Sequence, residues 1–238
     1  LGEDSFSEVT ALAYRWLTEG NLDLITALFV MLGRNEDIPL PRLFDEGVAG
    51  FMRLVGEGWR KADLRVADEH LASQAIVEAL TSLSGPTAAE AGTASSGARR
   101  AEQAGDAALV GAMEGDHQHF GALCVRVILE RAGWRVAYLG PDVPVEDFAH
   151  LQDSRGARLV CISFTPPHAP ADVQRALRIL SEFYQPERPY VLALGGDGVG
   201  SLPTGTLASG PFERVAAFSS SAAFQEWLEE TFPFLGTA

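Results

Sequence analysis

The sequence is short of positive charge. Its 18 lysine and arginine residues stand against 32 aspartate and glutamate residues, which gives a formal net charge of -14, and Lys61 is its only lysine. No run of arginines is longer than the pair Arg99-Arg100. Proteins that bind nucleic acid neutralise its phosphates with clustered lysine and arginine side chains. The composition therefore argues against direct nucleic-acid binding by this chain.

Cysteines and long apolar runs are also scarce. The two cysteines, Cys124 and Cys161, lie in apolar segments without the spacing of metal ligands, so we expect two reduced core residues and no disulfide. No apolar run is long enough to span a bilayer, and the first residues, "LGEDSF", lack the charged and apolar regions of a signal peptide. We therefore expect a cytoplasmic protein that does not bind membranes.

Apolar residues themselves are abundant, at 47% of 238 residues, and their spacing divides the chain. Over residues 1–84 they recur at helical intervals in four segments, which predicts a four-helix bundle. The segments are "SFSEVTALAYRWLTEGN", "LDLITALFVMLGR", "LPRLFDEGVAGFMRLVGEGWRKADL" and "VADEHLASQAIVEALTSL". Residues 85–106 are mostly small or polar and have little to bury, which indicates a linker.

Residues 107–238 alternate differently. Five short apolar segments rich in Val, Ala and Leu are separated by helical ones, which predicts an α/β domain with a five-stranded, doubly wound parallel sheet. The strands are "AALVGAM", "RVAYLG", "RLVCISFT", "YVLALGG" and "RVAAFSS". Ligands of such sheets bind at the carboxyl ends of the strands. We expect the loops "EGDHQHFG", "YLGPDVP", "SFTPPH" and "GGDGVG" to form one rim there.

Three groups of residues on this rim suggest a binding site. They are Asp116, Gln118 and Gly121; Ser163 and Thr165; and Gly195 and Gly196. The glycines would let the backbone approach a bulky ligand closely, and the serine hydroxyl could donate to or accept from that ligand. Glycine-rich loops alone are equally typical of a phosphate or nucleotide site.

The spacing resembles that of cobalamin-binding domains of the flavodoxin-like type. These carry Asp-x-His-x-x-Gly after the first strand, Ser-x-Leu about forty residues later, and then a Gly-Gly pair. Here 41 residues separate Gly121 from Ser163. The resemblance implies a flavodoxin-like fold and a bound cobalamin.

A second pattern lies in the bundle, where nine residues separate Trp59 from the pair Glu69-His70. It resembles the signature of adenosylcobalamin-dependent photoreceptors of the CarH and LitR type. The resemblance implies that the bundle caps the corrin, that Trp59 packs against the adenosyl group, and that Glu69 contacts the ligand. His70 would reach cobalt once the adenosyl group has left. The MerR-type DNA-binding domain of that family is not among these residues, so we expect an upstream or fused output domain, or a protein partner.

The departure from the family pattern that bears on the metal is Gln118, which stands where the histidine below cobalt is expected. Three alternatives follow: His117 or His119 supplies the ligand; the cofactor binds with its own base or with water below; or the site holds a bilin, such as biliverdin, beside or instead of cobalamin. His168 on the same rim is predicted to be an exposed loop residue.

The functional expectation is a cobalamin-binding, light-sensing regulatory module that is not an enzyme. By resemblance, photolysis of adenosylcobalamin would shift the bundle against the sheet domain and change a homo-oligomer, either a dimer or a tetramer. Two alternatives remain: a corrinoid carrier for methyl transfer, and an interaction module without a cofactor.

Overall fold

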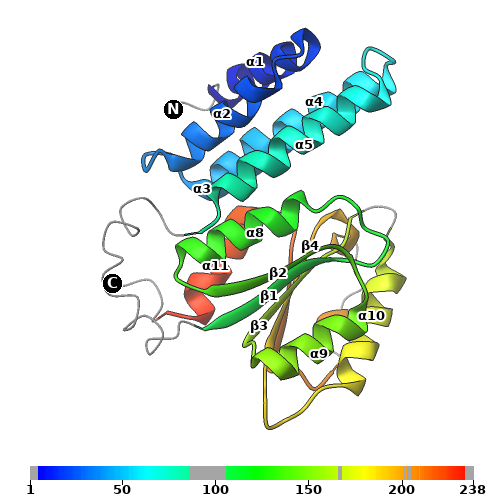
Figure 1. Ribbon diagram of the computed structural model, residues 1–238. Helices are drawn as coiled ribbons and strands as arrows, with labels where there is room; N and C mark the ends of the chain where they lie inside the picture. Colours follow the sequence, from blue (N-terminus) through cyan, green and yellow to red (C-terminus); the bar gives the residue numbers. More distant parts are fainter. Residues whose placement is uncertain are drawn as a thin grey trace. The chain divides into compact units, whose positions relative to one another are not determined.

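The computed structural model describes residues 5–85, 106–165, 168–200, 202, 205–208 and 210–233. The chain divides into two compact units, Leu1–Ser84 and Gly85–Ala238, whose elements are labelled in Figure 1. Of the linker predicted at 85–106, only Gly85 and Asp106 are among the described residues.

The first unit is helical, as the apolar spacing predicted. Its elements are α1 (Ser5–Glu19), α2 (Leu22–Arg34), α3 (Leu40–Arg42), η1 (Leu43–Val48), α4 (Ala49–Arg60) and α5 (Val66–Leu83). The third predicted helix is made of three consecutive elements, α3, η1 and α4. Large apolar side chains from different helices, among them Ile25, Phe29, Phe51 and Ile76, are buried in this unit.

The middle element of the third helix, η1, is a π-helix. The Ala49 N–H, which follows it, donates to the carbonyl of Phe44, five residues earlier. Gly47 lies in this segment against Phe6 of α1, and a β-carbon at position 47 would come within 3.1 Å of the Phe6 ring. The absence of a side chain at Gly47 therefore allows α1 to pack closely on the π-helical turn.

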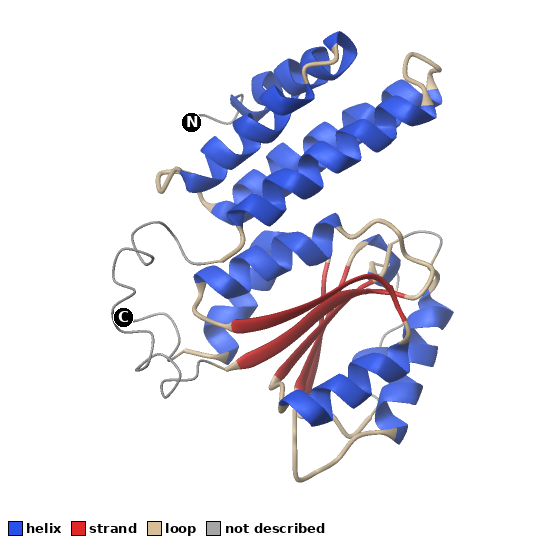
Figure 2. Ribbon diagram, viewed as in Figure 1, coloured by secondary structure: helices blue, strands red, loops and turns tan. Residues whose placement is uncertain are grey.

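The second unit is a five-stranded parallel sheet with helices on both faces (Figures 1 and 2). The strand order is β2-β1-β3-β4-β5, so the predicted flavodoxin-like fold is confirmed. The strands are β1 (Ala107–Met113), β2 (Arg135–Val143), β3 (Leu159–Ser163), β4 (Val191–Gly195) and β5 (Arg214–Phe218). The helices are α8 (Phe120–Arg131), α9 (Val145–Arg155), α10 (Pro170–Glu182) and α11 (Ser221–Thr231), with short 3-10 turns at Asp197–Val199 and Thr206–Ala208. Helices α8 and α11 cover one face of the sheet, and α9 and α10 cover the other.

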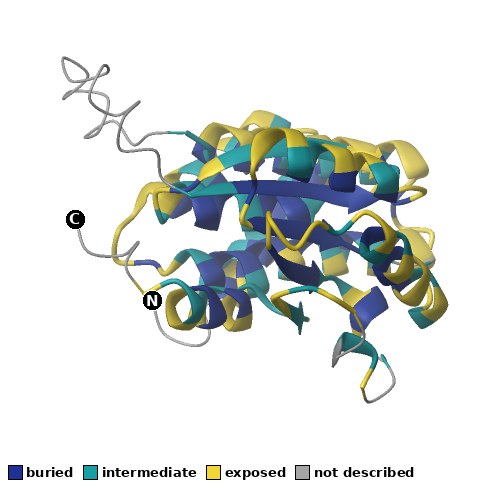
Figure 3. Ribbon diagram, turned by 90° about the horizontal axis from the view of Figure 1, so that it is seen from below, coloured by how far each residue is buried: buried dark blue, intermediate teal, exposed yellow. Residues whose placement is uncertain are grey.

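The central strands form the core of this unit. Strands β1, β3 and β4 are buried along almost their whole length, as Figure 3 shows, which fits near-continuous apolar runs covered on two faces. Cys124 and Cys161 are buried and form no disulfide, as expected. Burial raises the pKa of the Cys161 thiol, so this thiol stays protonated and poorly nucleophilic. Among the described residues, no helix is both long and apolar enough to cross a membrane.

Strand β2 is longer than the sequence predicted. It was expected to end at Gly140, but it continues through Pro141 and Asp142 to Val143. The ladder with β1 is irregular there, and both Gly140 and Asp142 have positive φ angles, of 89° and 57°. Because β2 is an edge strand, a proline and a bulge cost it few ladder hydrogen bonds.

Candidate functional site

The predicted rim residues of the sheet lie side by side. Ser163, the last residue of β3, pairs with Ala112 of β1 on one side and with Gly195 of β4 on the other. The strand order changes direction at β1 and β3, because β2 lies beyond β1 and the later strands lie beyond β3. Parallel sheets bind ligands beside such a switch point. The fold therefore places these loops where a ligand is expected.

Asp116 ties together the loops that follow β1 and β3. Its side chain is buried, with 2% of the residue exposed. Oδ1 accepts hydrogen bonds from the Gln118 N–H (3.0 Å) and the Thr165 hydroxyl (2.5 Å), and Oδ2 accepts one from the Thr165 N–H (2.8 Å). Both carboxylate oxygens are thus engaged by the protein's own loops.

Gly121 lies next to the Ser163 hydroxyl. A β-carbon at position 121 would be 3.7 Å from Ser163 Oγ, and Gly121 is itself exposed near the start of α8. No other described residue hydrogen-bonds to that hydroxyl. The glycine therefore keeps open a space beside Ser163 that a larger side chain would fill.

Replacing Gly121 with leucine is expected to weaken cobalamin binding at least about tenfold, since the side chain would occupy this space. Leucine favours helices, so the fold should be kept. Gly121→Ala is the matched control, because its single carbon would make only an ordinary van der Waals contact with Ser163. Titration of each variant with cobalamin, followed by absorbance, measures the effect. Equal affinity of the leucine and alanine variants would contradict this role.

Gly195 is the last residue of β4 and Gly196 follows it, and the structure explains the lack of a side chain differently at the two positions. Gly196 has φ 96° and ψ 170°, and a β-carbon there would lie 2.3 Å from the Phe164 carbonyl oxygen. The lack of a side chain at Gly196 is therefore required for packing on the neighbouring loop, and its contact with a ligand stays a prediction. A β-carbon on Gly195 would have no atom closer than the Phe218 carbonyl oxygen, at 3.9 Å, so Gly195 does leave an open space.

The residues proposed to act below cobalt lie on the loop before α8. The side chains of His117 and Gln118 are exposed. His119 Nδ1 lies 3.3 Å from the His117 carbonyl oxygen, and its ring is near those of Phe120 and Tyr138, with centroids 6.2 Å and 6.4 Å away. His119 thus packs toward strand β2. Ligation of cobalt by His117 or His119 stays a prediction.

His168 is not the exposed loop residue that was predicted. Its side chain is only 9% exposed, with Nδ1 3.8 Å from an oxygen of Asp172, and its ring packs edge-on against the buried Phe164. Nε2 is buried and has no hydrogen-bond partner among the described residues. The prediction failed because burial of the ring depends on Phe164 and on the loop after β1, where Gly115 lies beside it.

The first unit carries Trp59, Glu69 and His70. Trp59 lies in the last turn of α4 and is 52% exposed, so its indole is accessible to a ligand or partner. Glu69 accepts a hydrogen bond from the Ser73 hydroxyl (2.8 Å), and its other oxygen lies 3.3 Å from His70 Nδ1. Val66, at the start of α5, is another exposed apolar residue of this unit.

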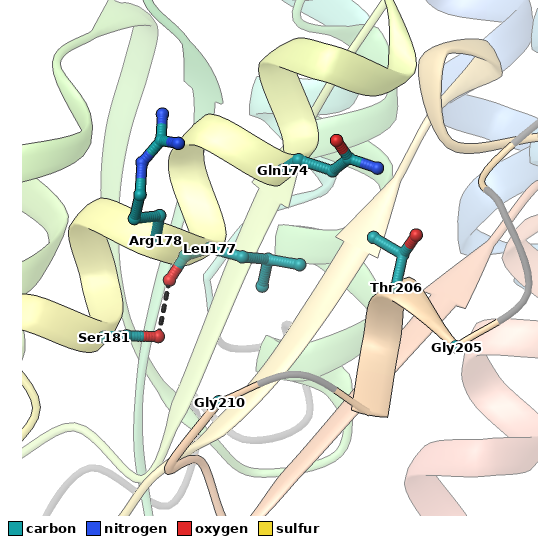
Figure 4. Close-up of a pocket in the computed structure, with 7 residues that line it drawn as sticks. All are labelled: Gln174, Leu177, Arg178, Ser181, Gly205, Thr206 and Gly210. Carbon is teal, nitrogen blue, oxygen red and sulfur yellow. Dashed lines mark hydrogen bonds between the residues drawn. The ribbon is translucent and has the colours of Figure 1, made fainter.

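A separate hollow of about 580 Å³ lies between α10 and the β4–β5 connection (Figure 4). Its described lining is Gln174, Leu177, Arg178, Ser181, Gly205, Thr206 and Gly210. None of these is a predicted site residue. The rim residues, rather than this hollow, hold the candidate site.

Comparison with known proteins identifies the ligand. Residues 107–222 match the family described as B12 binding domain, and residues 14–84 match a second family with the same description. The HTH-type transcriptional repressor CarA of Myxococcus xanthus is 30% identical over 135 residues, which cover 57% of this chain and 42% of CarA. The chain thus spans less than half the length of that relative.

The fold also resembles a solved corrinoid protein. The monomethylamine corrinoid protein of Methanosarcina barkeri superposes with a TM-score of 0.63 at 15% identity, over 95% of this chain and 99% of that one. At this identity the likeness shows the fold alone. The rim leaves room for a corrinoid, because Gly121 is exposed beside Ser163 and a β-carbon on Gly195 would meet no described atom closer than 3.9 Å. The chain is a cobalamin-binding protein, in which a helical B12-binding cap precedes a flavodoxin-like B12-binding domain.

Proposed function

We propose that this cobalamin-binding chain is a light-sensing regulatory module and not an enzyme. The observation that carries the proposal is the exposed Trp59 of the B12-binding cap, which precedes Glu69 and His70 at the spacing of the CarH and LitR photoreceptors. The likeness to CarA, a transcriptional repressor, supports a regulatory role. We further propose that adenosylcobalamin is the native form and that the output belongs to another domain or a partner.

The cap residues have distinct roles in this proposal. Bound adenosylcobalamin supplies a cobalt–carbon bond that light breaks. The Trp59 indole covers the adenosyl group. Ser73 holds one oxygen of Glu69, and the other oxygen lies against His70 Nδ1. Most of the His70 side chain, 74%, is exposed, so its imidazole would be accessible to cobalt after adenosyl loss.

Signalling requires that the protein prefer different arrangements in its two states. A ligand shifts an equilibrium only by its differential affinity for those arrangements. Trp59 supplies this difference, because its indole is covered only while the adenosyl group is present. We expect the homo-oligomer formed with adenosylcobalamin in the dark to change its size in light, which size-exclusion chromatography measures. Identical dark and light profiles would contradict this part of the proposal.

The deciding experiment is an absorption spectrum of the protein purified in the dark from cells supplied with cobalamin. It should show adenosylcobalamin, and green light should change it irreversibly as the adenosyl group is lost. A corrinoid carrier shares the fold, as the corrinoid protein of Methanosarcina barkeri shows, but Gln118 weighs against the redox cycling of cobalt. Methyl transfer without a light response would favour the carrier. The predicted bilin gains no support from the described residues or the relatives, and the same spectrum would reveal its separate absorption.

Replacing Trp59 with alanine tests the cap directly. We expect it to lower the preference for adenosylcobalamin over hydroxocobalamin about thirtyfold, because a large aromatic at the centre of an interface contributes about 2 kcal/mol or more. Met31→Ala is the control, since Met31 is also an exposed apolar residue of the first unit, at 62%. Binding of both cobalamins in the dark gives the ratio. An unchanged ratio for Trp59→Ala would remove the tryptophan from the adenosyl site.

A further inference from the structure

Asp116 is the one buried carboxylate among the residues that the structure describes. Its negative charge is balanced by no nearby lysine or arginine in the described hydrogen bonds. It is stabilised instead by three donors, the Gln118 N–H, the Thr165 N–H and the Thr165 hydroxyl. Buried charges require such partners, because an unpaired one is costly. The Asp116 carboxylate is therefore hydrogen-bonded to Thr165 and to the main chain of its own loop.

The hydroxyl bond is the shortest of the three. Thr165 Oγ1 lies 2.5 Å from Oδ1 of Asp116, within the range of short hydroxyl bonds to a charged carboxylate. The Thr165 N–H adds a second bond to the other oxygen at 2.8 Å. A single residue thus engages both oxygens and fixes the plane of the carboxylate.

This arrangement bears on metal ligation, since a histidine that binds a metal almost always donates its second N–H to a carboxylate or carbonyl, which orients the ring. Asp116 is the natural partner for an imidazole on the loop before α8. Its Oδ1, which faces that loop through the Gln118 N–H, already accepts two hydrogen bonds, from this N–H and from the Thr165 hydroxyl, so both of its acceptor positions are used.

We propose that Thr165 decides how the lower face of the corrinoid is ligated: by occupying Asp116, its hydroxyl removes the support that an imidazole ligand would need, and cobalt is bound with no protein imidazole below it. Thr165 is a positioning residue that acts through Asp116. The proposal rests on cobalamin binding alone, so a chain that binds cobalamin without responding to light would leave it standing.

The nearby histidines have contacts that fit this assignment. The His119 ring lies toward Tyr138 and Phe120 on the β2 side. His168, in the loop before α10, is buried, and its Nδ1 lies 3.8 Å from an oxygen of Asp172. His117 is exposed, and Asp116 has no free Oδ1 with which to orient its ring. The glutamine at position 118 contacts Asp116 through its main-chain N–H only.

The test uses cobinamide, a corrinoid that lacks the nucleotide base, so that any nitrogen below cobalt must come from the protein. The bound cob(II)inamide is examined by electron paramagnetic resonance, where an axial nitrogen splits the cobalt lines into triplets. Four proteins are compared: wild type, Gln118→His, the double variant Gln118→His with Thr165→Val, and the double variant Gln118→His with Thr165→Ser. Valine removes the hydroxyl at nearly constant shape, whereas serine keeps it.

We expect nitrogen splitting only in the valine double variant, where Oδ1 of Asp116 is released to hold the new imidazole. Wild type, Gln118→His and the serine double variant should lack it. Splitting in wild type or in Gln118→His alone would overturn the proposal, and it would do so even if a double variant failed to fold. Absence of splitting in a valine double variant that binds cobinamide as wild type does would also overturn it. So would equal splitting in the valine and serine variants.

Discussion

Replacing Gly196 with alanine is expected to destabilise the second unit by about 3 kcal/mol, one of the two largest effects that we predict for a single substitution. The backbone at this position has φ 96° and ψ 170°, a region that is essentially reserved for glycine. The added β-carbon would also lie 2.3 Å from the Phe164 carbonyl oxygen. Because domains are stable by only about 5–15 kcal/mol, such a loss should lower the urea midpoint markedly.

The neighbouring glycine provides the control. Gly195→Ala places its β-carbon 3.9 Å from the nearest atom, at a residue with no positive φ, so it should unfold close to the wild-type urea concentration. Its effect should appear in cobalamin affinity, because the new methyl group enters the open space on the rim. Equal midpoints for the two variants would show that the contact between Gly196 and Phe164 does not constrain the fold.

Replacing Asp116 with alanine is expected to cost a similar amount, about 3 kcal/mol, and to abolish most cobalamin binding. The change removes three hydrogen bonds and leaves the N–H groups of Gln118 and Thr165 without their acceptor. Each buried donor left unsatisfied costs about 1–3 kcal/mol. The loops after β1 and β3 would then lose the carboxylate that joins them.

Asp172→Ala is the matched control for this change. Asp172 also accepts a hydrogen bond from a main-chain N–H of the loop before α10, that of Ala169 (2.8 Å), but its side chain is partly exposed. Loss of such a helix cap costs about 1 kcal/mol. Urea unfolding and cobalamin titration of both variants measure the difference. If Asp116→Ala were no less stable than Asp172→Ala, burial of Asp116 would contribute nothing to its role.

The sequence predicted the fold well because its signals were local. Helical spacing of apolar residues located α1, α2 and α5, and short apolar segments located all five strands. The extension of β2 was missed, because Pro141 ordinarily ends a strand. Only its place at the edge of the sheet, a property of the assembled fold, allows the strand to continue.

The site was predictable in position but not in its contacts. Spacing placed Asp116 and Ser163 on one rim, since the carboxyl ends of neighbouring parallel strands lie together. It did not show that Thr165 would occupy Asp116, because that bond joins residues 49 positions apart. The packing of Gly196 on Phe164 and the burial of His168 are long-range contacts of the same kind.

The π-helical segment Leu43–Val48 has a consequence for the aromatic residue of the cap. Each residue of an α-helix turns the chain by about 100°, and a π-helical turn accommodates one extra residue, so every later side chain is rotated by about that angle. Trp59 follows the segment by about three turns. Deleting one residue from the segment would restore a regular helix, turning Phe51 and Val55 off the core and Trp59 off its present face. The direction in which the Trp59 side chain points is therefore set by the π-helical segment about three turns before it.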